Sequence, residues 1–306
     1  MSKKSNPEKP MSRLEMERDL AELTKHLESQ NFASIEEANA YLKTFTGKKI
    51  GSSIKRRKTN KDKAFDLIIE AEDASVYQGT KLVRKALELD PECVDAYNYL
   101  ANNADSLENA MQLFQKGMTI GRQALGEDYF AENAGYFWGL HETRPYMRAK
   151  EGYARTLAMS ERYKEAIGEY RAMLVLNPTD NQGIRFLLAP LLLRQNFFRE
   201  YNDLFNNYKD DASSSWLYNR TLYLYLKFGG VARTMTALRN AIDANPYVVE
   251  LLIGEKELPD APPGYYQIGS FEEAVIYFEE SGTAWYAHEK ALYWLAEYWE
   301  RHLKMD

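Results

Sequence analysis

The chain has 306 residues, of which 45% are hydrophobic and 27% charged, with a net charge of −6. This composition is typical of a folded protein and excludes wholesale disorder. The longest apolar stretch, 186–193, contains Pro190 and is far shorter than the ~20 residues that cross a bilayer, so we expect no membrane association. The single cysteine, Cys93, predicts a reducing, cytoplasmic location.

The first expected elements are two short helices. Ser12–Glu15 and Ser34–Glu37 both have the spacing of a capping box, in which a serine and a glutamate three residues later satisfy the first backbone N–H groups. The first box precedes an apolar stripe at helical spacing, formed by Met16, Leu20, Leu23 and Leu27. Residues 1–47 are therefore predicted to form an N-terminal helical pair after a disordered start.

A strongly basic run follows the N-terminal pair. Residues 48–63 contain eight lysines and arginines against one acid, Asp62. We interpret the run as a flexible linker. Clustered basic residues also favour nucleic-acid binding, although no aromatic side chain is interleaved to stack on bases. An intramolecular contact with the acidic body of the chain is a third possibility.

Repeats of about 34 residues organise the centre of the chain, 64–250. Pro178 and Pro246 lie 68 residues apart, which is twice the repeat length, and Pro91 ends a similar segment. The segment that ends at Pro178 carries Ala166 and Tyr170 at the spacing of the second helix of a tetratricopeptide repeat, and it resembles that family. The resemblance implies an all-α, right-handed α-solenoid of helix pairs with an insertion at about 126–146.

The segment 251–306 is predicted to cap the solenoid. Ser270 and Glu273 form a further capping box, and a last helix from about Ala284 carries aromatic residues that include Trp285. Three other segments, 136–148, 177–185 and 263–266, resemble a bacterial group related to the suppressor of tumorigenicity 7 protein. That resemblance implies helical repeats and protein association, and no defined chemistry.

The repeat register also predicts a partner-binding groove. In tetratricopeptide repeats the first helix of each pair lines the groove, and the register assigns to such positions Asn98, Asn102, Arg148, Arg155, Arg185, Asn219 and Tyr223. The three arginines are predicted to form a basic patch, because the acids near them in sequence are too few to neutralise all three. Guanidinium groups bind carboxylates in a bidentate manner, so an acidic extended peptide is the expected partner.

Residues of the predicted insertion form a second candidate cluster, made of Trp138, Glu142, Arg144 and Tyr146. We expect them to hold the insertion against its neighbours, with ligand binding and catalysis as alternatives. Neighbouring helical residues point about 100° apart, so His141 and Glu142 are not expected to converge on one atom. The four histidines are scattered, and no metal site or cofactor is predicted.

Taken together, these patterns predict a non-enzymatic scaffold that binds a protein or peptide. A nucleic-acid-associated protein that uses the segment 48–63 is the first alternative. An enzyme that uses the cluster at 141–146 is the second.

Overall fold

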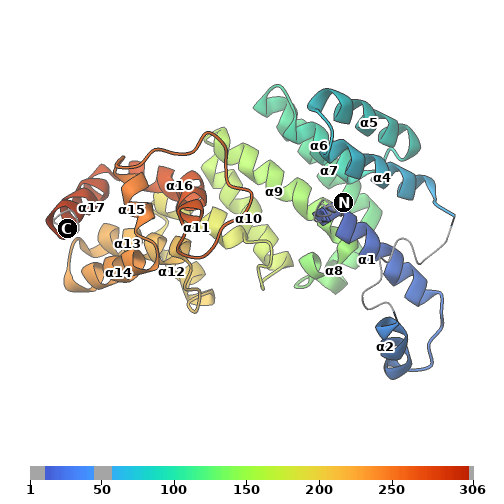
Figure 1. Cartoon of the computed structure of the whole chain (residues 1–306), viewed down its shortest axis with the longest axis horizontal. Helices are drawn as coiled ribbons and strands as arrows, with labels where there is room; N and C mark the ends of the chain where they lie inside the picture. Colours follow the sequence, from blue (N-terminus) through green and yellow to red (C-terminus); the bar gives the residue numbers. More distant parts are fainter. Residues whose placement is uncertain (1–10, 45–56, 303–306) are drawn as a thin grey trace, which may run out of the picture. The chain divides into compact units, whose positions relative to one another are not determined.

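The computed structural model describes residues 11–44 and 57–302 (Figure 1). Within these ranges every regular element is a helix, so the predicted all-α class is confirmed. The chain divides into two compact units. Unit 1 is Met1–Ser160 with Val175–Pro178, and unit 2 is Glu161–Leu174 with Thr179–Asp306.

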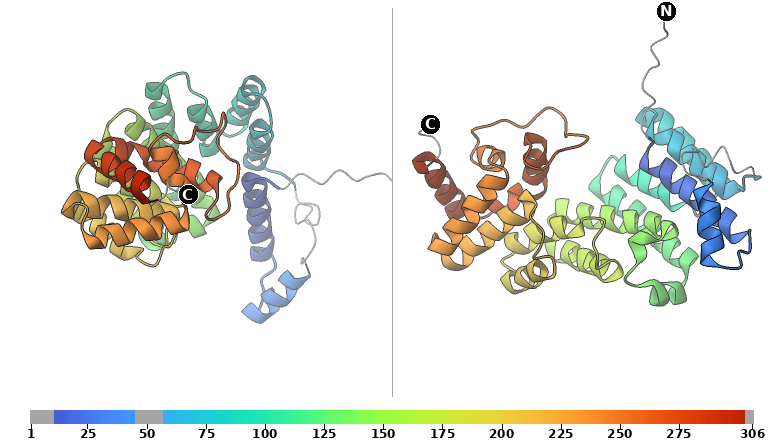
Figure 2. Two further views of the ribbon diagram at one scale, coloured as in Figure 1. Left: turned by 60° about the vertical axis from the view of Figure 1, so that its left-hand side comes forward. Right: turned by 60° about the horizontal axis from the view of Figure 1, so that its bottom comes forward.

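Unit 1 is built from helices that pack mainly against their neighbours in sequence. Helix α4 packs on α5, α6 packs on α7, and α9 packs against both α6 and α7. Helix α1 lies beside α4, as Figures 1 and 2 both show. The elements are α1 (Arg13–Glu28), α2 (Ile35–Lys43), α4 (Asn60–Glu72), α5 (Val76–Leu89), α6 (Val94–Asn102), α7 (Leu107–Leu125), α8 (Glu127–Asn133), the 3-10 turns η1 (Phe137–Gly139) and η2 (His141–Thr143), and α9 (Arg144–Met159).

Unit 2 has the same pairwise construction. Helix α13 packs on α14, α11 on α12, and α16 covers α11, α13 and α15. Its core is rich in large aromatic side chains, with Trp216, Tyr218, Tyr277 and Trp285 fully buried. The elements are α10 (Tyr163–Leu176), α11 (Ile184–Arg194), α12 (Phe198–Asn207), α13 (Ser214–Phe228), α14 (Ala232–Ala244), α15 (Tyr247–Leu252), α16 (Phe271–Tyr286) and α17 (Glu289–His302).

The prolines that defined the repeat register lie at equivalent places. Pro91, Pro178 and Pro246 each come two residues after the end of a second helix, α5, α10 and α14 respectively. Proline cannot continue a helix, because it lacks an N–H and its ring clashes with the preceding turn. The repeat without a proline also has both predicted helices, α11 and α12. The paired helices of an α-solenoid are therefore present.

Two predicted boundaries are wrong. The basic segment was expected to be a linker as far as residue 63, but α4 begins at Asn60, because Thr59 and Asp62 form a capping box within the basic run. The remainder of that segment, 48–56, lies outside the described residues. The last helix was expected to begin near Ala284. Instead α16 continues to Tyr286, Trp285 is buried within it, and α17 begins at Glu289.

Candidate partner-binding site

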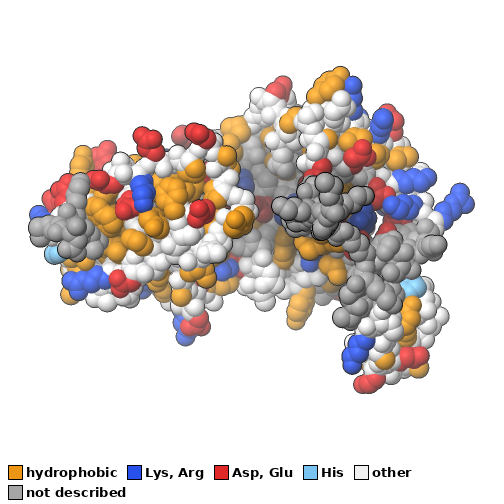
Figure 3. Space-filling model, in the orientation of Figure 1, with side chains coloured by type: hydrophobic (Ala, Val, Ile, Leu, Met, Phe, Trp, Pro, Cys, Tyr) orange, Lys and Arg blue, Asp and Glu red, His pale blue; other side chains and the backbone are white. Residues whose placement is uncertain are grey.

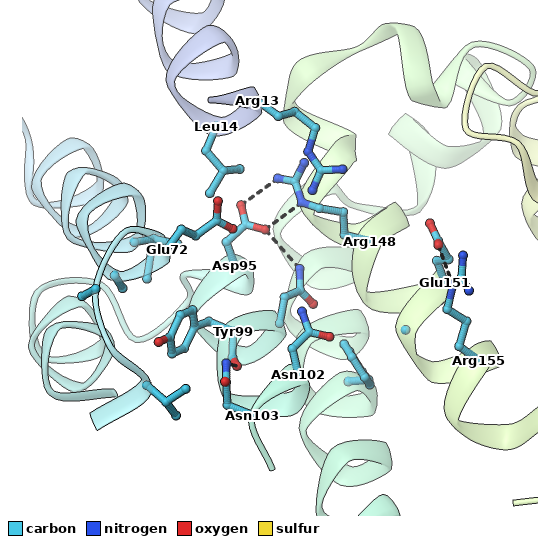
Figure 4. Close-up of a pocket in the computed structure, with 17 residues that line it drawn as sticks. Arg13, Leu14, Glu72, Asp95, Tyr99, Asn102, Asn103, Arg148, Glu151 and Arg155 are labelled. Carbon is cyan, nitrogen blue, oxygen red and sulfur yellow. Dashed lines mark hydrogen bonds and ion pairs between the residues drawn. The ribbon is translucent and has the colours of Figure 1, made fainter. Parts of the chain in front are cut away.

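A hollow of about 580 Å³ lies on the face of unit 1 formed by α4, α6 and α9, which we call the groove face. These are the first helices of their pairs, as the repeat register predicted. Figure 4 shows side chains from all three helices, and Leu14 of α1, around this hollow. Among the predicted groove residues it is lined by Asn98, Asn102, Arg148 and Arg155.

Arg148 is the most buried cation of the groove face. Its Nε and Nη2 atoms donate to the two carboxylate oxygens of Asp95 at 3.0 and 2.9 Å, and its Nη1 atom donates to Glu17 of α1 at 2.8 Å. The Arg148 side chain is only 10% exposed. Burial alone would lower the pKa of Arg148, but the carboxylates of Asp95 and Glu17 raise it above the ordinary arginine value. The charge of Arg148 is therefore balanced inside the molecule.

Asn98 connects α6 to the start of α9. Its Nδ2 atom donates to Asp95 at 3.1 Å and to the backbone carbonyl of Pro145 at 3.0 Å. Its Oδ1 atom is buried, and within the part of the chain that the structure describes no donor reaches it. Asn98 thus holds Asp95 in place for Arg148.

Arg155 and Asn102 form the more exposed side of the hollow. Arg155 Nε donates to Glu151 at 2.9 Å, and the arginine side chain is 47% exposed. Gly152 lies between Glu151 and Arg155 on α9, and a Cβ added there would be 2.3 Å from the ring of Phe114. A side chain at this groove position would collide with the ring.

Arg185 belongs to unit 2 and is also paired. Its Nη1 atom lies 2.9 Å from Asp180 and its Nη2 atom 2.7 Å from Asp211, while its guanidinium stacks over Phe186 at 4.1 Å. The expectation that Arg148, Arg155 and Arg185 together keep some net positive charge is therefore wrong, because each is paired with at least one carboxylate. The acids that neutralise Arg148 lie 53 and 131 residues away in sequence, so local spacing did not reveal them.

Asn219 and Tyr223 of α13 are buried in unit 2 and do not line an open groove. Asn219 accepts a hydrogen bond from Tyr277 at 3.2 Å and donates to Ser281 at 3.5 Å. Tyr223 stacks on Tyr201, with ring centroids 5.0 Å apart. Both side chains were predicted to face a partner. In the structure Asn219 joins α13 to α16, and Tyr223 joins α13 to α12.

The cluster in the insertion separates into three local roles. Glu142 accepts a hydrogen bond from Tyr129 at 2.7 Å, Arg144 donates to the backbone carbonyl of Trp138 at 3.0 Å, and Tyr146 is buried in the core of the insertion. Burial would raise the pKa of Glu142, but the hydrogen bond from Tyr129 holds it below the ordinary value.

Two further contacts involve this cluster. His141 Nδ1 lies 3.1 Å from Glu142 Oε2, because the two residues occupy a tight 3-10 turn rather than an α-helix. The acid that approaches Arg144 is Glu17, at 3.4 Å, and not Glu142. The cluster is thus connected to α1 as well as to the insertion.

Helix α1 faces the groove in an unexpected orientation. Of the predicted apolar stripe, Met16 and Leu20 are 48% and 45% exposed, whereas Glu17 is 5% exposed. Leu14, outside the predicted stripe, is buried with Ile68 of α4 in the core of unit 1. The stripe was read from hydrophobic spacing alone. The structure turns the helix so that its carboxylate meets the arginines of α9.

The described end of the basic segment pairs with acids of unit 1. Lys58 forms an ion pair with Asp66 of α4, and Lys61 lies 3.7 Å from Glu92. Lys48, Lys49, Lys55 and Arg56 of the same segment are not among the described residues. Within 11–44 and 57–302, no group of three or more histidine, cysteine or acidic side chains is arranged to hold a metal ion. No helix in these ranges is long and apolar enough to span a bilayer.

Comparisons with known proteins add little to this picture. The sequence matches no protein-family profile and no curated protein. A solved structure described as "YrrB: a TPR protein with an unusual peptide-binding site" is similar over 59% of this chain and 83% of that chain, with 19% sequence identity and a TM-score of 0.43. Function is therefore inferred from the residues of this chain.

Proposed function

We propose that the protein is an interaction scaffold that binds an acidic segment of a partner protein on the groove face of unit 1. One observation carries the proposal: a carboxylate from a distant segment, Glu17, is already bound there by Arg148 and Arg144. The groove face therefore has the chemistry to accept a carboxylate from a helix laid against it.

The hollow beside α1 supplies further groups that suit a peptide. Asn102 and Asn103 are exposed there, and an amide side chain can donate to a backbone carbonyl and accept from a backbone N–H. Tyr99 adds an apolar ring with a polar tip, and Arg155 adds a half-exposed cation. A row of such groups along neighbouring helices fits an extended chain better than a small molecule.

A direct test uses fluorescein-labelled 12-residue peptides in acidic, neutral and basic sets, with anisotropy measured against the full chain. The acidic set should bind most tightly. The double variant Asn102→Ala/Arg155→Ala should weaken that binding by about tenfold or more. Arg162→Ala is the matched control, because Arg162 forms a comparable exposed pair with Glu165 at 2.7 Å and does not line the hollow. Equal loss in both variants, or binding that ignores peptide charge, would contradict the proposal.

The two alternatives receive less support. The described basic residues Lys58 and Lys61 are engaged with acids, which favours an intramolecular contact over nucleic acid for that part of the segment. Glu142, Arg144 and Tyr146 contact different partners, so they do not converge on a common substrate position. The relation to the suppressor of tumorigenicity 7 group and the cytoplasmic location remain predictions from sequence.

A further inference from the structure

We infer that α1 occupies a site on unit 1 that a partner protein can also bind. A helical segment of the partner, with a leucine followed three residues later by a glutamate, would replace Leu14 and Glu17 there. The inference rests on the proposed function and names the partner's chemistry. Residues of unit 1 that pair with α1, or that share a core cluster with Leu14, form what we call the α1 seat: Asp62, Asp66, Ile68, Arg144 and Arg148.

The apolar part of the seat is small. Leu14 is 2% exposed and shares the core cluster with Ile68, whereas Met16 and Leu20 of the same helix are about half exposed. A helix that is a permanent part of a core normally buries its apolar stripe. Helix α1 instead presents its carboxylate side to unit 1, which is how a charged ligand meets a receptor.

The polar part of the seat also includes two ion pairs made by α1 residues that follow Glu17. Arg18 lies 3.5 Å from Asp66, and Lys25 lies 3.5 Å from Asp62. These two pairs are partly exposed, so salt screens them more than it screens Glu17 with Arg148. Another helix with acidic and basic residues in the same order can therefore replace most of the polar contacts of α1.

The seat stays formed when α1 leaves. Arg148 keeps both hydrogen bonds to Asp95, and Arg144 keeps its bond to the carbonyl of Trp138. Helix α1 closes its own first turn through the capping box of Ser12 and Glu15, so its N-terminus does not depend on the seat.

A partner also has room that α1 does not use. The hollow of about 580 Å³ begins at Arg13 and Leu14 and continues past Asn102 to Arg155. A partner helix seated at Ile68 and Arg148 can continue into this hollow as an extended chain. Such a partner would contact both the α1 seat and the proposed peptide groove. These additional contacts would let the partner compete with α1, which is covalently joined to its own site.

The test uses the full chain and a fluorescein-labelled peptide with the sequence of residues 11–28. Glu17→Ala weakens the resident helix, so the peptide should bind this variant about tenfold more tightly than the unchanged chain, since apparent affinity scales with the fraction of open sites. Leu14→Ser should have the same effect without removing an acid. Glu28→Ala is the matched control, because it removes the same charge from an exposed end of α1. A peptide with the Glu17→Ala change should bind none of the four chains, which are the unchanged chain and the Glu17→Ala, Leu14→Ser and Glu28→Ala variants.

A second readout follows α1 directly. Hydrogen exchange by mass spectrometry, with the peptide made mass-distinct by ¹³C and ¹⁵N, should show faster exchange in residues 14–27 of the chain when the peptide is present. Equal peptide affinity for all four chains, with unchanged exchange, would overturn the occupant inference. The proposed function would survive that result if acidic 12-residue peptides still bind at Asn102 and Arg155. Loss of those peptides as well would reject both.

Discussion

Glu17 of α1 and Arg148 of α9 are 131 residues apart in sequence and form an ion pair with an Nη1–Oε2 distance of 2.8 Å. Asp95 completes the group from the other side of the guanidinium. A buried cation with two carboxylates is stable as a set, but removal of its central member leaves uncompensated negative charges.

The first prediction follows from that group. Arg148→Ala should lower the free energy of unfolding of the chain by about 3–5 kcal/mol, because Asp95 and Glu17 are left buried without their cation. Arg155→Ala should cost about 0–1 kcal/mol, since its pair with Glu151 is partly exposed. Urea denaturation followed by circular dichroism measures both. Equal, small losses for the two variants would show that the buried pairs of Arg148 are dispensable.

The second prediction concerns the insertion. Glu142→Ala and Tyr129→Phe should each lower the free energy of unfolding by about 0.5–1.5 kcal/mol, because each removes the same hydrogen bond. The double variant should lose little more than either single one. The pKa of Glu142 is lowered in the folded state, so its contribution is present above the unfolded pKa and is lost as pH falls through the folded one. Additive losses in thermal unfolding at pH 7 would rule out this pairing.

The third prediction tests the buried polar group that holds α16. Glu273 Oε2 accepts hydrogen bonds from Ser214 at 2.9 Å, Asn245 at 3.0 Å and the Gly269 backbone at 2.7 Å. Glu273→Ala leaves these donors unsatisfied and should cost about 2–4 kcal/mol. Its neighbour Glu272 is exposed, so Glu272→Ala is the control, with an expected cost below about 1 kcal/mol. Chemical denaturation of unit 2 with similar losses for both would show that the network is dispensable.

The fourth prediction uses pH at the hollow. Partial burial and the nearby Asp95 raise the pKa of Glu72, although Arg13 lowers it. The ionised form is therefore disfavoured in the folded state, and stability is lost as pH rises from the unfolded pKa through the folded one. Glu72→Gln should raise the melting temperature at pH 7, and the gain should disappear below about pH 4. Glu70→Gln on the same helix should show no such gain, and a gain independent of pH would contradict the electrostatic cause.

The helix pairs could be predicted from the sequence because their signals are local. The prolines at 91, 178 and 246 each end a second helix, and the spacing between them revealed the repeats. The start of α4 was missed since eight basic residues masked the cap formed by Thr59 and Asp62. Helix propensity and capping act at that point regardless of net charge.

The candidate site could be predicted only in part. The register placed Asn98, Asn102, Arg148 and Arg155 on the face where the hollow lies. It could not reveal that Glu17 pairs with Arg148, because a one-dimensional pattern carries no information on contacts between distant segments. It also could not show that Asn219 is buried against α16 and Tyr223 against α12. In unit 2, hydrophobic side chains instead gather on the surface around α15 and α16, as Figure 3 shows, with Tyr265 and Ile268 among the most exposed.

Since α1 and its seat belong to one chain, the seat meets α1 at an effective concentration that dilution does not change. For a segment joined covalently to its own site, effective concentrations on the order of millimolar are typical. A segment added in trans competes only with its own bulk concentration, so a lone copy at micromolar abundance needs roughly a thousandfold better affinity to win half of the sites. A partner that presents several such segments, or that is anchored nearby by another contact, escapes that requirement. The number of segments on the partner and its local concentration would then determine when such a segment replaces α1 in the seat.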